Sequence, residues 1–230
     1  MDMDIRLVKA LVGQQLKHDK TGHGIDHIER VVHLSLTFAK QLHADQDTVA
    51  LIALLHDVDD YKLVGIDKAS TYENAITIMT QCVIPPIKQH KILESIKQIG
   101  YSRYLEGIRP ITLEGQIVSD ADMCDAIGAN GLLRVYAYGM SKGQPFFNRE
   151  VFPQALTDAN QYRQHGSQYT IHHFFDKLLK LKDLMMTEPG KKEAIIRHQY
   201  LIDFLNHFFR EENASAWVQY LSRVTKDYFI

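Results

Sequence analysis

Residues 54–62 read LLHDVDDYK, where an apolar run ends in a histidine beside an aspartate and two more carboxylates follow within three residues. The apolar run predicts a buried helix, so His56 and Asp57 are expected at the edge of the core. Carboxylates that leave water repel each other and resist desolvation unless a cation or a hydrogen-bond partner compensates them. The stretch therefore predicts a compensating positive charge.

The composition is that of an ordinary globular protein, with 45% hydrophobic and 23% charged residues in a chain of 230. We expect one domain over residues 1–230. The net charge of −2 gives no general electrostatic case for a nucleic acid polymer or a membrane surface as partner. The first twenty residues are charged from the second position and hold no apolar stretch long enough for a signal peptide, so we expect a cytoplasmic protein.

Apolar residues recur at helical spacing along most of the chain, and no run alternates with period two, so the predicted fold is all-α. Asp26 followed by Glu29 has the pattern of a capping box and predicts a helix from about His27 to His43. The run DQDTVALIALLHD predicts a central, buried helix that begins behind Asp45 or Asp47. Further helices are predicted within residues 70–81, 85–99, 112–129, 171–186, 192–209 and 214–225.

The stretch near residues 139–168 has no sustained period and is predicted to be a long irregular insert. Segments of this length are usually functional lids or disordered excursions. Its aromatic residues argue against full disorder: Phe146, Phe147, Phe152 and Tyr162.

An adjacent His-Asp pair can present a nitrogen and an oxygen to one metal ion, but a stable site needs further ligands. His27 is predicted on the first turn of a helix, 29 residues before His56. The run VSDADMCDAIGA, residues 118–129, offers three carboxylates on a later helix: Asp120, Asp122 and Asp125. The chain therefore contains a plausible ligand set for one ion.

This ordered set resembles the signature of the HD-domain metal-dependent phosphohydrolases, which is a histidine, a distant His-Asp pair and a final aspartate. The matching residues are His27, His56, Asp57 and Asp122, and the family's Ala-Asp-x-x-Asp-Ala pattern selects Asp122 over Asp120. Residues 173–181 and 185–211 resemble a small bacterial branch related to nucleotide pyrophosphohydrolases, so the resemblance covers about residues 20–212.

The resemblance implies a single HD-domain helical bundle that hydrolyses a phosphoanhydride or phosphoester. The implied substrate is a nucleotide, namely a nucleoside triphosphate that is cut to monophosphate and pyrophosphate. Two histidines and two aspartates carry a formal charge of −2, which balances one divalent ion. The family favours Mn²⁺, while Fe²⁺, Ni²⁺ or Zn²⁺ also suit mixed ligands and Mg²⁺ prefers more oxygen. Such an ion would polarise a phosphoryl oxygen and lower the pKa of water towards about 7.

Other residues receive roles with open alternatives. Asp57 and Asp60 are candidate catalytic carboxylates, although Asp59 and Asp60 equally fit a solvated turn after a helix. His23 is a third catalytic candidate, or else it only decorates a loop. Asp125 is expected to orient a nearby His or Arg. His172 and Asp176, four residues apart on a predicted helix, could bind a second metal ion; alternatively, His172 is a packed histidine that is hydrogen-bonded to its neighbour.

Phosphate recognition needs cations that converge from several elements. The candidates lie next to a predicted ligand or in a segment that matches the family, and each alone is more often a surface charge: Arg30, Lys62, Arg134 and Lys177.

Two other functions remain as alternatives. A di-iron oxygenase on the HD scaffold would need further ligands, yet residues 95–102, SIKQIGYS, contain no histidine where some HD enzymes add them. A non-catalytic regulator would bind metal and nucleotide without turnover. P-loop, GxGxxG, HExxH and GxSxG motifs are absent from the sequence.

Overall fold

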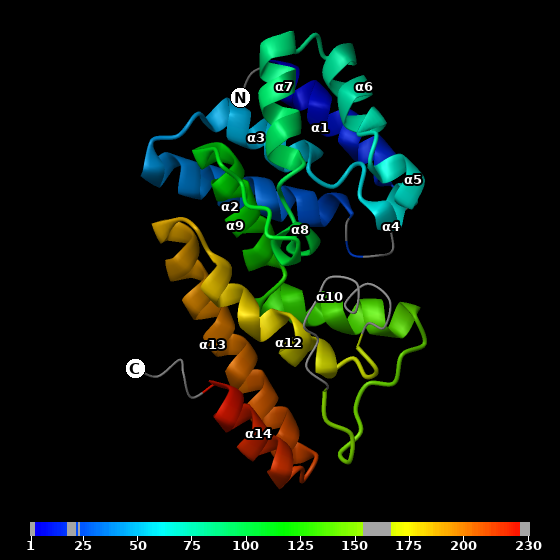
Figure 1. The fold of residues 1–230 in the computed structure, drawn as a ribbon, viewed down its shortest axis with the longest axis vertical. Helices are drawn as coiled ribbons and strands as arrows, with labels where there is room; N and C mark the ends of the chain where they lie inside the picture. Colours follow the sequence, from blue (N-terminus) through cyan, green and yellow to red (C-terminus); the bar gives the residue numbers. More distant parts are fainter. Residues whose placement is uncertain (1–2, 18–21, 23, 154–166, 226–230) are drawn as a thin grey trace. The chain divides into compact units, whose positions relative to one another are not determined.

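The computed structural model describes residues 3–17, 22, 24–153 and 167–225. Helices follow one another along this part of the chain, and the described residues contain no β-strand (Figure 1). The prediction of an all-α fold is confirmed. No helix within the described residues is long and apolar enough to cross a membrane.

The chain divides into two compact units. Unit 1 comprises residues 1–125 and 185–191, and unit 2 comprises residues 126–184 and 192–230. Unit 1 contains α1 (Met3–Gln15), α2 (Ile25–Leu42), α3 (Gln46–Leu55), α4 (Tyr61–Val64), α5 (Ile66–Ala69), α6 (Glu73–Gln81), α7 (Pro86–Ile96), α8 (Tyr101–Leu105) and α9 (Leu113–Asp125). The domain range of 1–230 stays a prediction.

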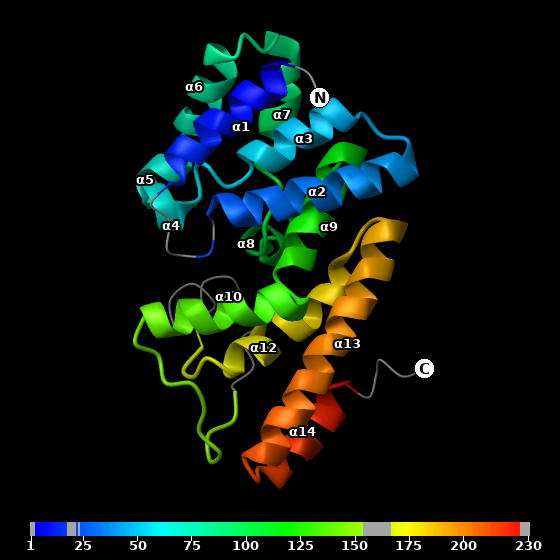
Figure 2. The same cartoon turned by 180° about the vertical axis from the view of Figure 1, so that it is seen from behind.

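Helix α3 is the centre of unit 1, because every residue from Thr48 to Leu55 is buried. It packs against α1, α2, α7 and α9, and Figure 2 shows these helices around it from behind. Its N-terminus is capped by Asp45, whose Oδ1 accepts hydrogen bonds from the backbone N–H groups of Asp47 and Thr48 at 3.1 Å. The predicted central, buried helix is confirmed, with Asp45 as its cap.

Helix α2 begins two residues earlier than the sequence predicted, at Ile25, behind an extended Gly24. The capping box is therefore wrong: Asp26 already lies in the first turn, and its carboxylate accepts from Arg30 Nη1 at 3.0 Å. Glu29 pairs with Lys9 of α1 at 2.8 Å. The earlier start still leaves His27 in the first turn, where its side chain is completely buried.

Unit 2 contains α10 (Gly128–Ser141), α12 (His172–Asp176), the 3₁₀ helix η1 (Leu178–Leu184) and α14 (Ser215–Thr225). The last helix before α14 is α13 (Glu188–Glu211), whose first turn belongs to unit 1 and whose remainder belongs to unit 2. The sequence analysis did not predict α10. The single helix predicted within residues 171–186 is wrong, because the chain leaves helical geometry at Lys177, where φ is −135°.

An aromatic cluster around the buried Trp217 forms the core of unit 2. The irregular segment 142–153 contributes to it, since Phe152 stacks on Trp217 at 4.5 Å and Phe147 lies 5.2 Å from the same ring. The indole Nε1–H also donates to the carbonyl of Arg149 at 2.9 Å. These contacts fix the first half of the predicted irregular insert, which begins after Ser141; residues 154–166 lie outside the described part of the chain.

Candidate metal centre

Three helices of unit 1 bring the four predicted ligands together. Helix α2 packs against both α3 and α9. The first turn of α2 supplies His27, the end of α3 supplies His56 and Asp57, and α9 supplies Asp122. Residues that are far apart in the sequence therefore meet at one point inside a single unit.

The ring of His27 is oriented by Asp125, which lies one helical turn after Asp122. Nδ1 of His27 donates to Asp125 Oδ2 at 2.7 Å, because an ionised carboxylate can only accept. Nε2 of the same ring then carries a lone pair, and it lies 3.3 Å from Asp57 Oδ2 and 3.5 Å from Asp122 Oδ1. The expectation that Asp125 orients a nearby His or Arg is confirmed.

The ring of His56 also directs its Nε2 atom inward, for a different reason. Helix ends leave carbonyl groups without helical partners, and His56 Nδ1–H donates to one of them, Ala53 O, at 2.8 Å. Its buried Nε2 has no hydrogen-bond partner within the described residues. This nitrogen lies 3.5 Å from Asp57 Oδ2 and 3.8 Å from Asp122 Oδ1.

The charges at this point are strongly coupled. Burial alone lowers the pKa of His56, but the negative charges of Asp57 and Asp122 prevail and raise this pKa to about 9. Burial alone likewise raises the pKa of Asp122, while the neighbouring protonated His56 prevails and lowers it. In the absence of a metal ion, a proton on the histidine supplies the positive charge that the carboxylates require.

Three of the four side chains could hold a divalent cation, and Asp122 lies beside them. Metal–ligand bonds of about 2.0 to 2.2 Å place neighbouring ligand atoms about 3 to 3.6 Å apart in tetrahedral or octahedral geometry. Three of the four nitrogen–oxygen separations, 3.3, 3.5 and 3.5 Å, lie within this range, and the fourth, from His56 to Asp122, is longer at 3.8 Å. Ligand atoms of His27, His56 and Asp57 all lie within 4.8 Å of one another. Two imidazole lone pairs directed at two carboxylates are a suitable donor set for such an ion.

Asp120 has a different environment from Asp122. It is completely buried, and Oδ2 accepts from the backbone N–H and the hydroxyl of Thr187, both at 2.7 Å. The backbone N–H of Met186 donates to Oδ1 at 2.9 Å. Burial raises the pKa of Asp120 more than these bonds lower it. Asp120 thus binds the start of α13, and the role of Asp122 as a metal ligand stays a prediction.

The carboxylates after the His-Asp pair also have separate surroundings. Both oxygens of Asp59 accept backbone hydrogen bonds at the start of α6, from Asn74 at 3.1 Å and from Ala75 at 2.9 Å. Asp59 is therefore a helix cap. Asp60 is half-buried and begins α4, since its carbonyl accepts from the backbone of Leu63 at 2.9 Å. His23 and the side chain of Lys62 lie outside the described part of the chain.

The candidate phosphate-binding cations are distributed over both units. In unit 1, Arg30 forms a bidentate ion pair with Asp125: its Nε donates at 2.7 Å and its Nη2 donates at 3.0 Å. Arg134 lies on α10 and Lys177 at the end of α12, both in unit 2. Their phosphate-binding roles stay predictions.

The His172 and Asp176 pair in unit 2 has other partners. His172 Nε2 donates to the carbonyl of Val151 at 2.9 Å, and Asp176 Oδ2 accepts from Ser167 Oγ at 2.7 Å. These bonds tie α12 to the neighbouring irregular segments and favour the packing alternative over a second metal.

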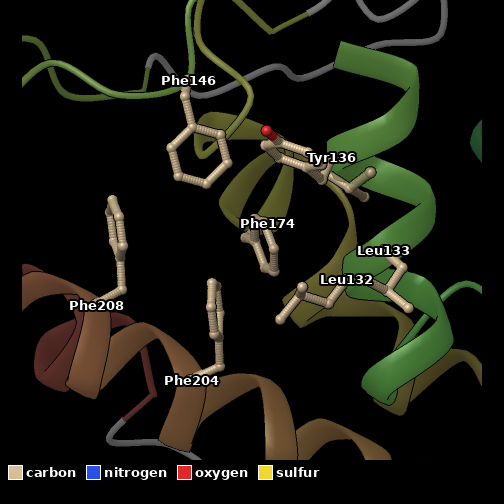
Figure 3. Close-up of a pocket in the computed structure, with 8 residues that line it drawn as sticks. Leu132, Leu133, Tyr136, Phe146, Phe174, Phe204 and Phe208 are labelled. Atoms are coloured by element: carbon tan, nitrogen blue, oxygen red, sulfur yellow. The ribbon is translucent and has the colours of Figure 1, made fainter. Parts of the chain in front are cut away.

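Sequence reasoning missed two features. One is the hydrogen bond from His56 to the carbonyl of Ala53. A histidine at the end of a helix can reach the carbonyl three residues earlier, and this spacing could have indicated the bond. The other is an apolar cavity of about 330 Å³ in unit 2, where aromatic rings from three helices and an irregular segment face one another (Figure 3). The cavity is lined by Leu132, Leu133, Val135, Tyr136, Phe146, Phe174, Phe204 and Phe208. This lining suits rings and alkyl groups and does not suit a phosphate.

An all-helical unit that brings together a His, a His-Asp pair and an Asp defines a class of candidate metal-dependent proteins, and the comparisons agree. The HD domain family model matches residues 24–127. A solved HD-superfamily hydrolase from Bacillus thuringiensis is 30% identical, with a TM-score of 0.70, covering 91% of this chain and 97% of that chain. The chain belongs to the HD superfamily.

Two further relatives are similar over most of their length. A crystal structure from Lactobacillus plantarum is 31% identical, with a TM-score of 0.82, covering 93% of this chain and 99% of that chain. The protein YpgQ of Bacillus subtilis is 27% identical over 208 residues, which is 89% of this chain and 91% of YpgQ. A crystal structure of YpgQ in complex with ADP superposes with a TM-score of 0.67.

Proposed function

We propose that this protein is a metal-dependent phosphohydrolase that cuts a nucleoside triphosphate to monophosphate and pyrophosphate. One observation carries the proposal: the Nε2 atoms of His27 and His56 both face the carboxylates of Asp57 and Asp122, at 3.3 to 3.8 Å. Carboxylates and imidazole nitrogens that converge at this spacing require a positive charge among them, which either a proton on a histidine or a metal ion can supply. A resident divalent ion is the cation that leads to hydrolytic chemistry.

The proposed ligands are His27, His56, Asp57 and Asp122, and we favour one Mn²⁺ over Mg²⁺, Fe²⁺, Ni²⁺ or Zn²⁺. When bound, the ion would supply Lewis-acid polarisation of a phosphoryl oxygen and of the attacking water. The formal ligand charge of −2 offsets the charge of the ion, so the buried site needs no other counter-ion.

The chain's own residues would orient the ligands and handle protons. Asp125 and Ala53 hold the two imidazole rings with their Nε2 atoms inward. Asp57 and Asp60 are the proposed proton acceptors: Asp57 lies in the candidate centre, and Asp60 follows it by three residues, at the start of α4. His23 is a further proposed catalytic group.

The proposed substrate is a small phosphorylated molecule. A relative from Bacillus thuringiensis is described as an HD-superfamily hydrolase, which supports hydrolysis, and the relative YpgQ has been crystallised with ADP, which supports a nucleotide. The candidate cations for the phosphate chain are Lys62, Arg134 and Lys177, whereas Arg30 is already paired with Asp125. Phosphate oxygens need several charge-assisted contacts of this kind.

The deciding experiment incubates the purified protein with a panel of nucleoside triphosphates, diphosphates and simple phosphodiesters, each with Mn²⁺, Mg²⁺, Ni²⁺ or Zn²⁺. Inorganic phosphate and pyrophosphate are measured separately. We expect metal-dependent release of pyrophosphate and nucleoside monophosphate. Release of inorganic phosphate alone from a triphosphate would defeat the pyrophosphohydrolase proposal, and metal-dependent binding without turnover would favour the regulator.

The number of metal ions per chain distinguishes the oxygenase alternative from the proposed phosphohydrolase. Within the described residues, one group of His, Cys, Asp and Glu side chains has the spacing of a metal site. The phosphohydrolase proposal therefore expects about one divalent ion per chain by elemental analysis, whereas a di-iron oxygenase would hold two irons.

A further inference from the structure

Asp125 lies between His27 and Arg30 and binds both. Its side chain is only 3% exposed. One oxygen accepts from His27 Nδ1 at 2.7 Å, and the other accepts from Arg30 Nε at 2.7 Å. Arg30 Nη2 donates a further bond to the first oxygen at 3.0 Å. The carboxylate is thus bound by two N–H groups of the guanidinium while it accepts a hydrogen bond from the imidazole.

This arrangement determines which nitrogen of His27 can bind a metal. An ionised carboxylate accepts and never donates, so the proton of a neutral His27 stays on Nδ1. The lone pair is left on Nε2, the atom that lies 3.3 Å from Asp57 Oδ2. The opposite tautomer would place an N–H in the centre and exclude a cation.

We propose that Asp125 and Arg30 are positioning residues that set the tautomer and orientation of His27 and thereby the affinity of the centre for its divalent ion. The inference rests on the metal site of the proposed function and deepens it. Under this proposal Arg30 serves the metal centre through Asp125 and does not serve as a phosphate ligand.

The second histidine provides an internal comparison. His56 is held by the main-chain carbonyl of Ala53, which no side-chain substitution removes. Only His27 depends on a replaceable carboxylate. Loss of that carboxylate should therefore weaken one of four ligands and leave the other three in place.

Arg30 is itself held at its outer end. Nη1 donates to Asp26 Oδ2 at 3.0 Å, and the Asp26 side chain is 77% exposed. An exposed pair of this kind contributes little. Asp26→Ala is consequently a matched control: it removes a carboxylate partner of Arg30 without touching the contact between Asp125 and His27.

The test measures Mn²⁺ binding to metal-free protein by calorimetry for wild type, Asp125→Ala, Asp125→Asn, Arg30→Gln and Asp26→Ala. We expect roughly ten- to hundredfold weaker binding for Asp125→Ala, the usual effect of losing a residue that orients a ligating histidine. Asp125→Asn keeps an acceptor oxygen of the same shape and should lie between wild type and Asp125→Ala. Arg30→Gln should resemble Asp125→Asn, and Asp26→Ala should stay within about threefold of wild type.

Nitrogen-15 NMR of the Zn²⁺-loaded protein gives a readout that a merely structural role would not move. Wild type should show a protected His27 Nδ1–H, and Asp125→Ala should lose this signal while that of His56 persists. Thermal unfolding of each metal-free variant identifies changes that are due to folding alone.

The outcomes separate this inference from the proposed function. Unchanged Mn²⁺ affinity in folded Asp125→Asn and Arg30→Gln, or an unchanged His27 signal in Asp125→Ala, overturns the positioning role alone. A wild-type protein that binds no divalent ion overturns both. Wild-type metal binding that depends on Asp125 but brings no nucleotide hydrolysis supports the inference and defeats the proposed activity.

Discussion

Asp120 and Thr187 lie 67 residues apart and are joined by two hydrogen bonds, from the backbone N–H and from the hydroxyl of Thr187 to one carboxylate oxygen. Thr187 Oγ1 in turn accepts from the backbone N–H of Gly190 at 3.1 Å and so caps α13. A side chain at position 190 would collide with Asp120. Asp120, which lies two positions before the proposed ligand Asp122, thus stabilises the N-terminus of α13.

This relationship predicts opposite effects for two neighbouring substitutions. Asp122→Ala should abolish stoichiometric metal and activity while the protein stays folded. Asp120→Ala leaves buried N–H groups without their acceptor and should lower the free energy of unfolding by about 2 to 4 kcal/mol, with metal affinity retained in the folded protein. Denaturant unfolding and elemental analysis check both. The reverse pattern would show that Asp120 is the ligand.

The His-Asp pair itself should be indispensable. His56→Ala and Asp57→Ala each remove a ligand from a buried site, so both variants should lose bound metal and hydrolysis together. Elemental analysis after extensive dialysis measures the first, and pyrophosphate release measures the second. Stoichiometric metal in either variant would contradict the proposed site.

A lysine substitution tests phosphate binding in unit 2. Lys177→Ala should leave metal content intact and lower kcat/KM for a nucleoside triphosphate roughly ten- to hundredfold, since one charge-assisted contact is worth about 1.5 to 3 kcal/mol. The loss should be smaller for a simple monoester. The exposed Lys180 is the matched control, and Lys180→Ala should change little. Equal activities of the two variants would remove Lys177 from the site.

Two buried serines of unit 1 should respond oppositely to alanine. Ser35 Oγ on α2 has no hydrogen-bond partner within the described residues, whereas Ser95 Oγ on α7 contacts Lys91 O at 3.0 Å and Thr112 Oγ1 at 3.2 Å. Ser35→Ala removes an unsatisfied hydroxyl and should stabilise the fold by about 1 kcal/mol. Ser95→Ala should destabilise it by about 1 kcal/mol. Chemical denaturation of both variants measures the difference, and a destabilised Ser35→Ala would count against this account.

His198 on α13 should make the stability depend on acid pH. Burial, aided by the charge of Lys182, lowers the pKa of this histidine to about 4. The unfolded chain therefore binds the proton more readily than the folded protein does. The stability that neutral His198 contributes is fully present above about pH 6.5 and is lost as the pH falls towards 4. The loss amounts to at most about 3 kcal/mol.

The control for this effect is His198→Gln, which cannot titrate. The difference in unfolding free energy between wild type and His198→Gln should shift against wild type as the pH falls from 7 to 4. Equal pH profiles for the two proteins would mean that His198 is protonated as easily in the folded state as in the unfolded state.

Local patterns predicted much of the fold. The cap of α3 by Asp45 depends on atoms two and three residues away, and the burial of α3 follows from apolar residues on all its sides. The false capping box at Asp26 and the break at Lys177 show the limit of such patterns. In the first case Gly24 starts the helix earlier; in the second, the bonds of His172 and Asp176 to irregular segments prevail over helical periodicity.

The sequence by itself determined the ligand types, their order and the all-helical class, because helix periodicity and residue chemistry are local properties. Tertiary structure decided what each of the similar carboxylates on α9 does. Asp120 faces a direction about 200° around the helix from Asp122 and meets Thr187, while Asp125 meets His27 and Arg30. The role of a buried carboxylate depends on which donors or cations replace its lost water, and these come from segments far away in the sequence.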